Sequence, residues 1–220
     1  MLNLPIKLFL MNTNDKFVIT ISREVGSGGR TVGRKLAEKL GVRFCDKQLI
    51  DKLVKMFGLN EGEIERIKGK KQNWLEDLFS RISPEFGSEM FIPRGVEEPP
   101  VVTSNEVFSY EKEILLSLAE ESSCVIAGRS GFFVLKDHPN KLDVFIHASR
   151  QKRIERVMRR QELSEKEAEQ VIDNVDKARE NYIQKFASTS RYDLRNYDLI
   201  LNMDYLTEDE AVECILKVIG

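Results

Sequence analysis

The chain has 220 residues, 41% of them hydrophobic, which is enough apolar material for a substantial buried core. Its 34 basic and 36 acidic side chains give a formal charge of −2 at pH 7, so no overall positive charge favours nucleic acid as a partner. Cys45, Cys124 and Cys214 lack CxxC spacing, which argues against a zinc site and a disulfide framework and favours a reducing, cytoplasmic location.

The N-terminal segment 1–12 is apolar, but Pro5 and Lys7 interrupt it and no small-residue cleavage site follows. We therefore expect a short extension here and not a signal peptide. No run of 18 apolar residues occurs in the sequence, so we expect neither a membrane span nor a membrane partner.

The next segment, 18–33, reads VITISREVGSGGRTVG and places a β-branched apolar strand directly before a glycine-rich turn and a helix start. Gly26, Gly28 and Gly29 allow positive φ angles and leave backbone N–H groups unobstructed. These amides and the positive end of the following helix favour a bound phosphate. The alternative is a tight turn that uses glycine only for packing, since a glycine-rich loop alone is a weak signal.

The loop differs from a Walker A motif, GxxxxGK[ST], whose lysine reaches the β and γ phosphates and whose hydroxyl binds magnesium. With Gly28 as the last loop glycine, Arg23 is the first position and Gly29 takes the place of the lysine. Thr31 takes the hydroxyl role and is the predicted magnesium ligand. We predict that Arg30 replaces the lysine, because it lies one residue further on and is permanently charged.

Five short β-rich runs occur along the chain, at 17–21, 42–45, 124–127, 142–147 and 198–202. Helical patterns separate them, which indicates parallel strands joined by crossovers and an α/β fold with a five-stranded parallel sheet. Glycines predict helix ends at Gly41 and Gly58. Capping-box spacing predicts two helix starts, at Ser164 with Glu167 and at Thr207 with Glu210.

Nearly eighty residues separate the second and third strands, far more than one crossover needs. Within them, 59–79 has a helical pattern, and 83–100 is rich in Pro, Gly and Glu and is expected to form loops. A final amphipathic helix is marked by Val107, Tyr110, Ile114, Leu115 and Leu118. An insertion at the carboxyl end of a strand is well placed to cover a substrate.

A second insertion, 150–195, has a local excess of lysine and arginine, including Arg153, Arg156 and Arg179. One interpretation is a solvated helix surface, because acidic residues are interleaved at ion-pair spacing. The other is a mobile helical hairpin whose arginines close over transferring phosphates and neutralise the transition state. The sequence leaves both interpretations open.

Six segments follow one another in a shared order: ITISREVGSGGRTVGRKLAEKLG, FCDKQLI, CVIAGRSGFFVL, DVFIHASRQKRIERVMRR, DKARENYIQKF and YDLILN. Together they resemble the cytidylate-kinase-like family of P-loop nucleoside monophosphate kinases. The resemblance implies a three-layer P-loop NTPase fold forming one kinase domain over 1–220, with a core at 16–50, 107–149 and 196–220. It also implies a helical monophosphate-binding insertion at 51–106 and a helical lid at 150–195.

The implied reaction transfers the γ-phosphoryl group of ATP, with magnesium, to a pyrimidine nucleoside monophosphate, CMP or dCMP. By the same resemblance, the loop that holds the ATP phosphates consists of Gly26, Ser27, Gly28, Gly29, Arg30 and Thr31. Nucleotides are then the expected partners, and the sequence does not identify a protein partner.

The resemblance also implies roles for residues outside the loop. Asp46, Arg129 and Ser130 match the acceptor site, with Arg129 on the acceptor phosphate. Arg153 and Arg156 match the start of the lid, where they contact ATP. The predicted catalytic residues are Arg129, Arg153 and Arg179, together with Arg30, which is predicted from its position and charge to replace the lysine.

The chemistry of Arg129 supports its role independently of the resemblance. It follows a predicted central strand, and the carboxyl ends of such strands line the crevice where α/β sheets bind ligands. Its planar fork suits a phosphate, which a lysine could not match. The alternative is a structural salt bridge at the strand end, with Asp46 as a candidate partner.

Two departures from the family pattern motivate other hypotheses. Gly29 stands where the lysine is expected, and Ser130 stands where an acidic residue is expected. The chain could therefore be a nucleotide-binding sensor that has lost catalysis. A third hypothesis keeps the kinase chemistry but changes the acceptor to another small molecule.

Overall fold

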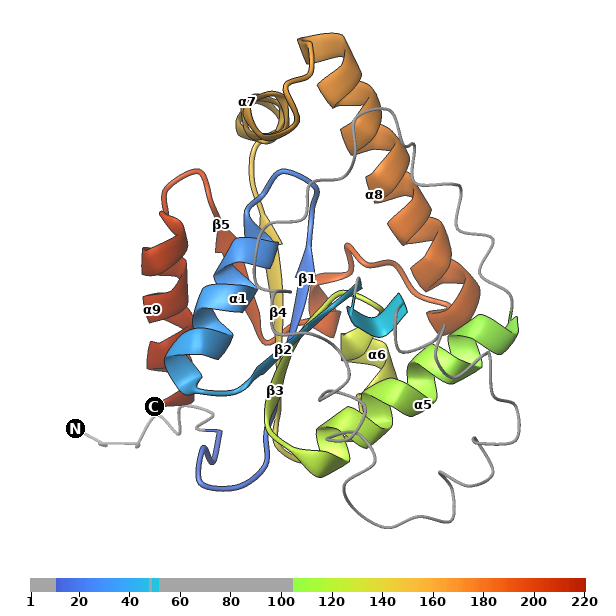
Figure 1. Cartoon of the computed structure of the whole chain (residues 1–220), viewed down its shortest axis with the longest axis vertical. Coiled ribbons are helices and arrows are strands. Elements are labelled where there is room, and N and C mark those ends of the chain that lie inside the picture. Colours follow the sequence, from blue (N-terminus) through green and yellow to red (C-terminus); the bar gives the residue numbers. More distant parts are fainter. Residues whose placement is uncertain (1–10, 48, 52–104) are drawn as a thin grey trace, which may run out of the picture.

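The computed structural model describes residues 11–47, 49–51 and 105–220 (Figure 1). Five parallel strands form one sheet: β1 (Val18–Arg23), β2 (Arg43–Asp46), β3 (Cys124–Ala127), β4 (Lys141–His147) and β5 (Leu199–Asn202). Their order in the sheet is β2-β3-β1-β4-β5, so β1 is the central strand. Val18 pairs with Cys124 of β3 and Lys141 of β4, which aligns the carboxyl ends of the three strands. The predicted five-stranded parallel sheet is confirmed.

Helices cover both faces of the sheet and make a three-layer α/β fold. On one face, α1 (Gly29–Leu40) packs beside α9 (Glu208–Ile219), and Leu36 and Ile215 are fully buried between helices and sheet. On the other face lie α5 (Asn105–Glu121) and α6 (Gly131–Val134). This arrangement explains Val18, Ile19 and Ile21 of β1, because a strand covered on both faces is largely apolar, and the buried Thr20 among them donates a hydrogen bond to Asp143.

The predicted amphipathic helix is α5, whose Ile114, Leu115 and Leu118 are buried against the sheet. Gly41 ends α1 in the left-handed conformation, as predicted. Both predicted capping boxes are present, at Ser164 and at Thr207. These local signals were readable because each depends on backbone groups within one helical turn.

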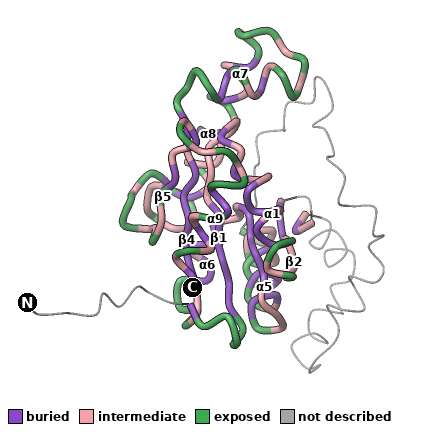
Figure 2. Tube along the Cα trace, turned by 90° about the vertical axis from the view of Figure 1, so that its left-hand side faces the viewer, coloured by how far each residue is buried: buried purple, intermediate pink, exposed green. Residues whose placement is uncertain are grey.

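Two helices of the region 150–195 rise from the carboxyl end of the sheet: α7 (Arg150–Gln161) and α8 (Glu165–Ala187) (Figure 1). A short 3-10 helix, η2 (Leu194–Asn196), leads from them to β5. A small apolar cluster between α7 and α8 includes Ile154, Val157 and Ile172, with Val25 of the loop packed against it. Figure 2 shows buried residues concentrated along the strands, whereas much of α7 is exposed.

Most of the predicted insertion at 51–106 lies outside the described residues, including Gly58, the helical pattern at 59–79 and the loops at 83–100. No helix in the described part of the chain is long and apolar enough to cross a membrane.

Candidate active site

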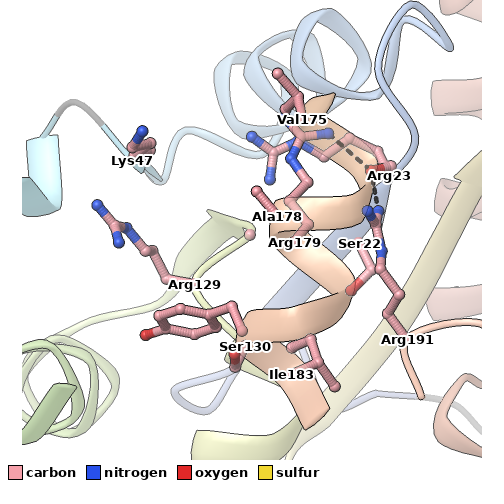
Figure 3. A pocket seen from close by; sticks show the side chains of 12 residues that line it. Ser22, Arg23, Lys47, Arg129, Ser130, Val175, Ala178, Arg179, Ile183 and Arg191 are labelled. Carbon is pink, nitrogen blue, oxygen red and sulfur yellow. Dashed lines mark hydrogen bonds between the residues drawn. The ribbon is translucent and has the colours of Figure 1, made fainter. Parts of the chain in front are cut away.

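A cavity lies at the carboxyl ends of β1 and β3, with α8 as one wall (Figure 3). Among the described residues that line it, five are basic and none is acidic. Lys47 and Arg129 lie on one side, and Arg23 and Arg179 lie across the cavity from them. The remaining described lining residues are Ser22, Gly128, Ser130, Val175, Ala178, Tyr182, Ile183 and Arg191. Such a wall favours an anionic ligand.

The glycine-rich loop between β1 and α1 continues from Ser22 and Arg23, which line this cavity. Gly26 and Gly28 have φ angles of 79° and 89°, in the region that favours glycine. A Cβ at Gly26 would lie 2.6 Å from the carbonyl oxygen of Arg153, so a side chain is excluded there. The hydroxyl of Ser27 donates to the Glu24 carbonyl at 2.9 Å and accepts from the Gly29 amide at 3.4 Å, which closes the turn. Gly29 then begins α1.

Arg23, the last residue of β1, fills the space beside Gly29. A Cβ at Gly29 would lie 2.6 Å from the Cβ of Arg23 and 3.1 Å from its Cγ. The Arg23 side chain continues toward β3, where one guanidinium nitrogen occupies the space that a Cβ at Gly128 would take. Burial, followed by the neighbouring Arg179 and Arg191, lowers the pKa of Arg23 to about 9. Sequence reasoning did not assign Arg23 to the site, although its unusual position at the start of the loop was visible.

Arg30 and Asp46, expected on ATP and on the acceptor respectively, contact each other. The Nε of Arg30 donates to Oδ2 of Asp46 at 2.8 Å, and an Nη lies 2.6 Å from the same oxygen. Asp46 also accepts from the Leu49 amide at 3.1 Å, so it fixes the chain after β2. The Thr31 hydroxyl accepts from Arg160 of α7 at 3.2 Å. Arg30 would have to leave Asp46, or share it, to reach a phosphate.

The turn after β3 has an unusual backbone. Gly128, Arg129 and Ser130 all have positive φ, at 90°, 54° and 55°. The left-handed conformation costs a residue with a side chain roughly 1–2 kcal/mol, and such strain clusters at functional sites. It turns Arg129 and Ser130 toward the cavity (Figure 3). The Ser130 hydroxyl is buried and has no hydrogen-bond partner among the described residues.

Arg129 is held by two carboxylates, and neither is Asp46. One Nη lies 2.5 Å from Oε1 of Glu111 on α5, and the other contacts Asp51. Glu111 is 1% exposed, and its other oxygen accepts from the hydroxyl of Tyr182 on α8. Burial raises the pKa of Glu111, while the Tyr182 hydroxyl opposes that rise. Burial also lowers the pKa of the Arg129 guanidinium. Glu111 and Tyr182 were not identified from sequence, because only the fold brings α5, β3 and α8 together.

Asp176 on α8 joins the predicted lid to the phosphate loop. Its carboxylate forms ion pairs with Arg153, Arg179 and Arg191 and accepts from the Val25 amide at 3.1 Å. Arg153 also donates to the Val25 carbonyl at 2.8 Å and lies 3.1 Å from Glu24. The sequence did not identify Asp176 as a site residue. Acidic residues interleaved with basic ones are also typical of an ordinary solvated helix surface.

Three arginines converge on the start of the loop. Arg179 and Arg191 both donate to the carbonyl of Arg23, as the dashed lines in Figure 3 show. Arg156 approaches from α7, with its guanidinium 3.1 Å from where a Cβ of Gly28 would lie. It also forms an ion pair with Glu208 at the start of α9. The predicted lid arginines therefore surround the loop, and Arg153 and Arg156 are tied to neighbouring carboxylates.

A parallel sheet with a glycine loop between β1 and α1, and a cationic cavity at its carboxyl edge, defines a kinase-like protein of the P-loop class. Residues 18–205 match the cytidylate kinase-like family, and the chain belongs to that family. Membership of a kinase-like family implies ATP as the phosphoryl donor.

Among curated relatives, a cytidylate kinase from Thermosipho melanesiensis is 26% identical over 215 residues, covering 91% of this chain and 95% of its own. Among solved structures, a protein from Eubacterium ventriosum has a TM-score of 0.68 at 24% identity, with 92% of this chain and 98% of that chain covered. A shikimate kinase from Bacteroides thetaiotaomicron has a TM-score of 0.48 at 19% identity, with 92% and 97% covered. The Eubacterium structure supports the same fold.

Proposed function

We propose that the protein transfers the γ-phosphoryl group of ATP to a nucleoside monophosphate, with CMP or dCMP as the acceptor. The observation that carries the proposal is the cavity with five basic side chains, which includes Ser22 and Arg23 at the end of β1, where the phosphate loop begins. A phosphoryl transfer between two nucleotides brings together many negative charges, and catalysis depends on positioning and neutralising them. The relative named cytidylate kinase supports the choice of acceptor.

In the proposed complex, the loop Gly26–Thr31 binds the ATP phosphates through backbone amides and the N-terminal end of α1. Arg129, oriented by Glu111, binds the acceptor phosphate, with Ser130 beside it. Asp46 lies at the acceptor side of the loop, and Arg153, Arg156 and Arg179 act from the lid region. No general base is required, since the chemistry demands alignment and charge stabilisation.

Magnesium would be held chiefly by phosphate oxygens, with Thr31 as the proposed protein ligand. This fits the preference of magnesium for one or two protein ligands in addition to phosphates and water. The ion would neutralise charge on the β and γ phosphates. The Thr31 hydroxyl, which now accepts from Arg160, would then turn one of its oxygen lone pairs toward the ion.

The basic wall also bears on which acceptor is bound. A neutral hydroxy compound would leave Lys47 and Arg129 facing the cavity without a counter-charge from the ligand. A phosphorylated acceptor supplies that charge. The cavity therefore favours a monophosphate over an uncharged alcohol within the kinase hypothesis.

The test is turnover of purified full-length protein with ATP, magnesium and a panel of acceptors, with ADP formation as the readout. The panel contains CMP, dCMP, UMP, AMP and GMP, together with uncharged sugars and anionic hydroxy acids as non-nucleotide acceptors. We expect turnover with CMP or dCMP. ATP binding without turnover on any acceptor would support the sensor hypothesis instead, and turnover only on a non-nucleotide would support another small-molecule kinase.

Arg129→Lys provides the residue-level test of the acceptor site. Lysine keeps the charge but loses the planar fork. We expect the KM for the monophosphate to rise about tenfold or more, while the KM for ATP changes little. A rise in the KM for ATP alone would contradict the assignment.

A further inference from the structure

We infer that Arg23, and not Arg30, supplies the positive charge that a Walker A lysine supplies in other P-loop proteins. The inference deepens the proposed kinase function and rests on it. It concerns the residue that meets the β and γ phosphates of ATP, which neither the family nor the relatives assign in this chain.

Side chains at positions 23 and 29 would compete for the same space. Gly29 occupies the lysine position, and the stem of Arg23 occupies the space that a side chain at Gly29 would need, with atoms at 2.6 and 3.1 Å. The two positions therefore exclude each other: a side chain can be present at 23 or at 29, but not at both. An arginine at the first loop position explains why glycine stands at the seventh, where a Walker A motif has its lysine.

The Arg23 side chain extends from the loop to the cavity. The Arg23 side chain runs from the end of β1 to Gly128 at the end of β3 and lines the cavity (Figure 3). It therefore connects the start of the phosphate loop with the cavity that Arg129 also lines, so it can contact a phosphate bound there. Arg30, in contrast, is directed to Asp46, which is the carboxylate that holds it.

The cavity that Arg23 lines concentrates positive charge. Arg179 and Arg191 lie close to Arg23, Arg129 and Lys47 face it across the cavity, and no acidic residue among the described ones lines that cavity, although Asp46 acts on Arg23 from outside it. Keeping like charges together in a buried site destabilises the free protein, and a bound polyphosphate relieves that repulsion. The pKa of Arg23 is lowered first by burial and then by the neighbouring Arg179 and Arg191. The arrangement is thus suited to an anion that bridges several cations.

The experiment exploits the mutual exclusion of side chains at 23 and 29. Four variants are compared with the full-length wild type: Arg23→Gln, Arg30→Gln, Gly29→Lys, and the exchange R23G/G29K, which restores the first glycine and the lysine of a Walker A motif and leaves Arg30 in place. Arg34→Gln is the matched control, because Arg34 lies on α1 and pairs only with Glu38 one turn away, at 3.4 Å, among the contacts of the described residues. Binding of MgATP and of ADP is measured by calorimetry, turnover by ADP formation, and folding by circular dichroism.

We expect Arg23→Gln to weaken MgATP binding about 10- to 100-fold, the loss typical of one charge-assisted contact. We expect kcat to fall about 100-fold, as when one electrostatic donor to a transition state is removed. Arg30→Gln should weaken MgATP binding less than Arg23→Gln does. Gly29→Lys should bind ATP poorly or fold poorly, and R23G/G29K should regain ATP binding to within about tenfold of wild type, because the glycine at 23 removes the clash.

Three results would overturn the inference. One is a wild type that turns over while Arg23→Gln binds MgATP as tightly as Arg34→Gln. Another is a larger loss of ATP binding in Arg30→Gln than in Arg23→Gln. The third is an R23G/G29K variant that folds but binds ATP no better than Gly29→Lys. A wild type that neither binds ATP nor turns over would instead remove the proposed function, and this inference with it.

Discussion

At the scale of single residues, the buried guanidinium of Arg129 lies against a buried carboxylate of opposite charge. Arg129 meets Glu111 at 2.5 Å, and Tyr182 donates to the other oxygen of the same carboxylate. Neutralising one partner of such a group leaves a charge without its counterpart in a dry environment, which costs more than the intact pair contributes. The three residues therefore behave as one unit that orients the guanidinium.

Tyr182→Phe isolates the contribution of the hydroxyl to this unit. In the folded protein the hydroxyl stabilises ionised Glu111 and opposes the rise of its pKa. We expect the variant to lose about 1–3 kcal/mol of unfolding free energy at pH 7.5, because a buried acceptor loses its donor.

The effect should depend on pH with a definite sign. Burial raises the pKa of Glu111 in the folded protein, so the protonated carboxyl contributes stability at low pH. This contribution is lost as the pH rises through the folded-state pKa. The tyrosine hydroxyl reduces that loss, so the difference between Tyr182→Phe and wild type should be large above this pKa and small below it. Urea unfolding at pH 4.5 and 7.5 measures both values, and an equal difference at the two pH values would contradict this explanation.

At the scale of elements, α8 is coupled to the phosphate loop through Asp176. A single carboxylate, 7% exposed, serves three arginines and the Val25 amide. The described part of the predicted lid is thus connected to the loop by polar contacts as well as by the apolar cluster around Ile154 and Val25. The position of Arg179 and Arg191 on the loop depends on the same carboxylate.

Asp176→Asn should separate these elements energetically. We expect a loss of about 3–5 kcal/mol in unfolding free energy, the range for removing one partner from a buried ion pair. ATP affinity should fall as well, because the arginines lose their orientation. Thermal unfolding and calorimetry measure the two effects. Asp173→Asn is the matched control, since Asp173 lies on the same helix and forms an exposed, solvent-screened pair with Arg150, so its loss should change stability little.

At the scale of the whole molecule, the sequence predicted the sheet, the helix caps and the phosphate loop, because each is encoded by residues close together in the chain. The strand-end turn at Arg129 was also visible in AGRS, whereas its partners Glu111 and Asp51 were not. Residues that meet only in the folded chain, such as Asp176 and Val25, leave no spacing pattern to read. Arg23 is the intermediate case: its place in the loop was evident, but the direction of its side chain depends on Gly29 and Gly128.

A ligand that binds the native protein and not the unfolded chain should stabilise the whole molecule. At a MgATP concentration of 100 times Kd, the expected gain is about 2.7 kcal/mol. For a chain of this length that corresponds to a rise in Tm of roughly 5–10 °C. Differential scanning fluorimetry with and without MgATP measures the shift, and AMP with magnesium serves as a control that lacks the β and γ phosphates. Equal shifts with both would place the recognition elsewhere than at those phosphates.

Arg23 ends the strand at the centre of the sheet, with β3 on one side and β4 on the other. Arg23 itself is in register with Ile146, and the Gly128 amide donates to the Ile21 carbonyl at 3.0 Å, two residues before it. A long arginine side chain loses about 2 kcal/mol of rotational freedom when it is ordered. Because two strands and two glycines confine this one, most of that entropy is lost when the chain folds and not when a ligand arrives. A cation that is already ordered in the empty protein lowers the stability of that state. In return, an anion binds to it more tightly and faster.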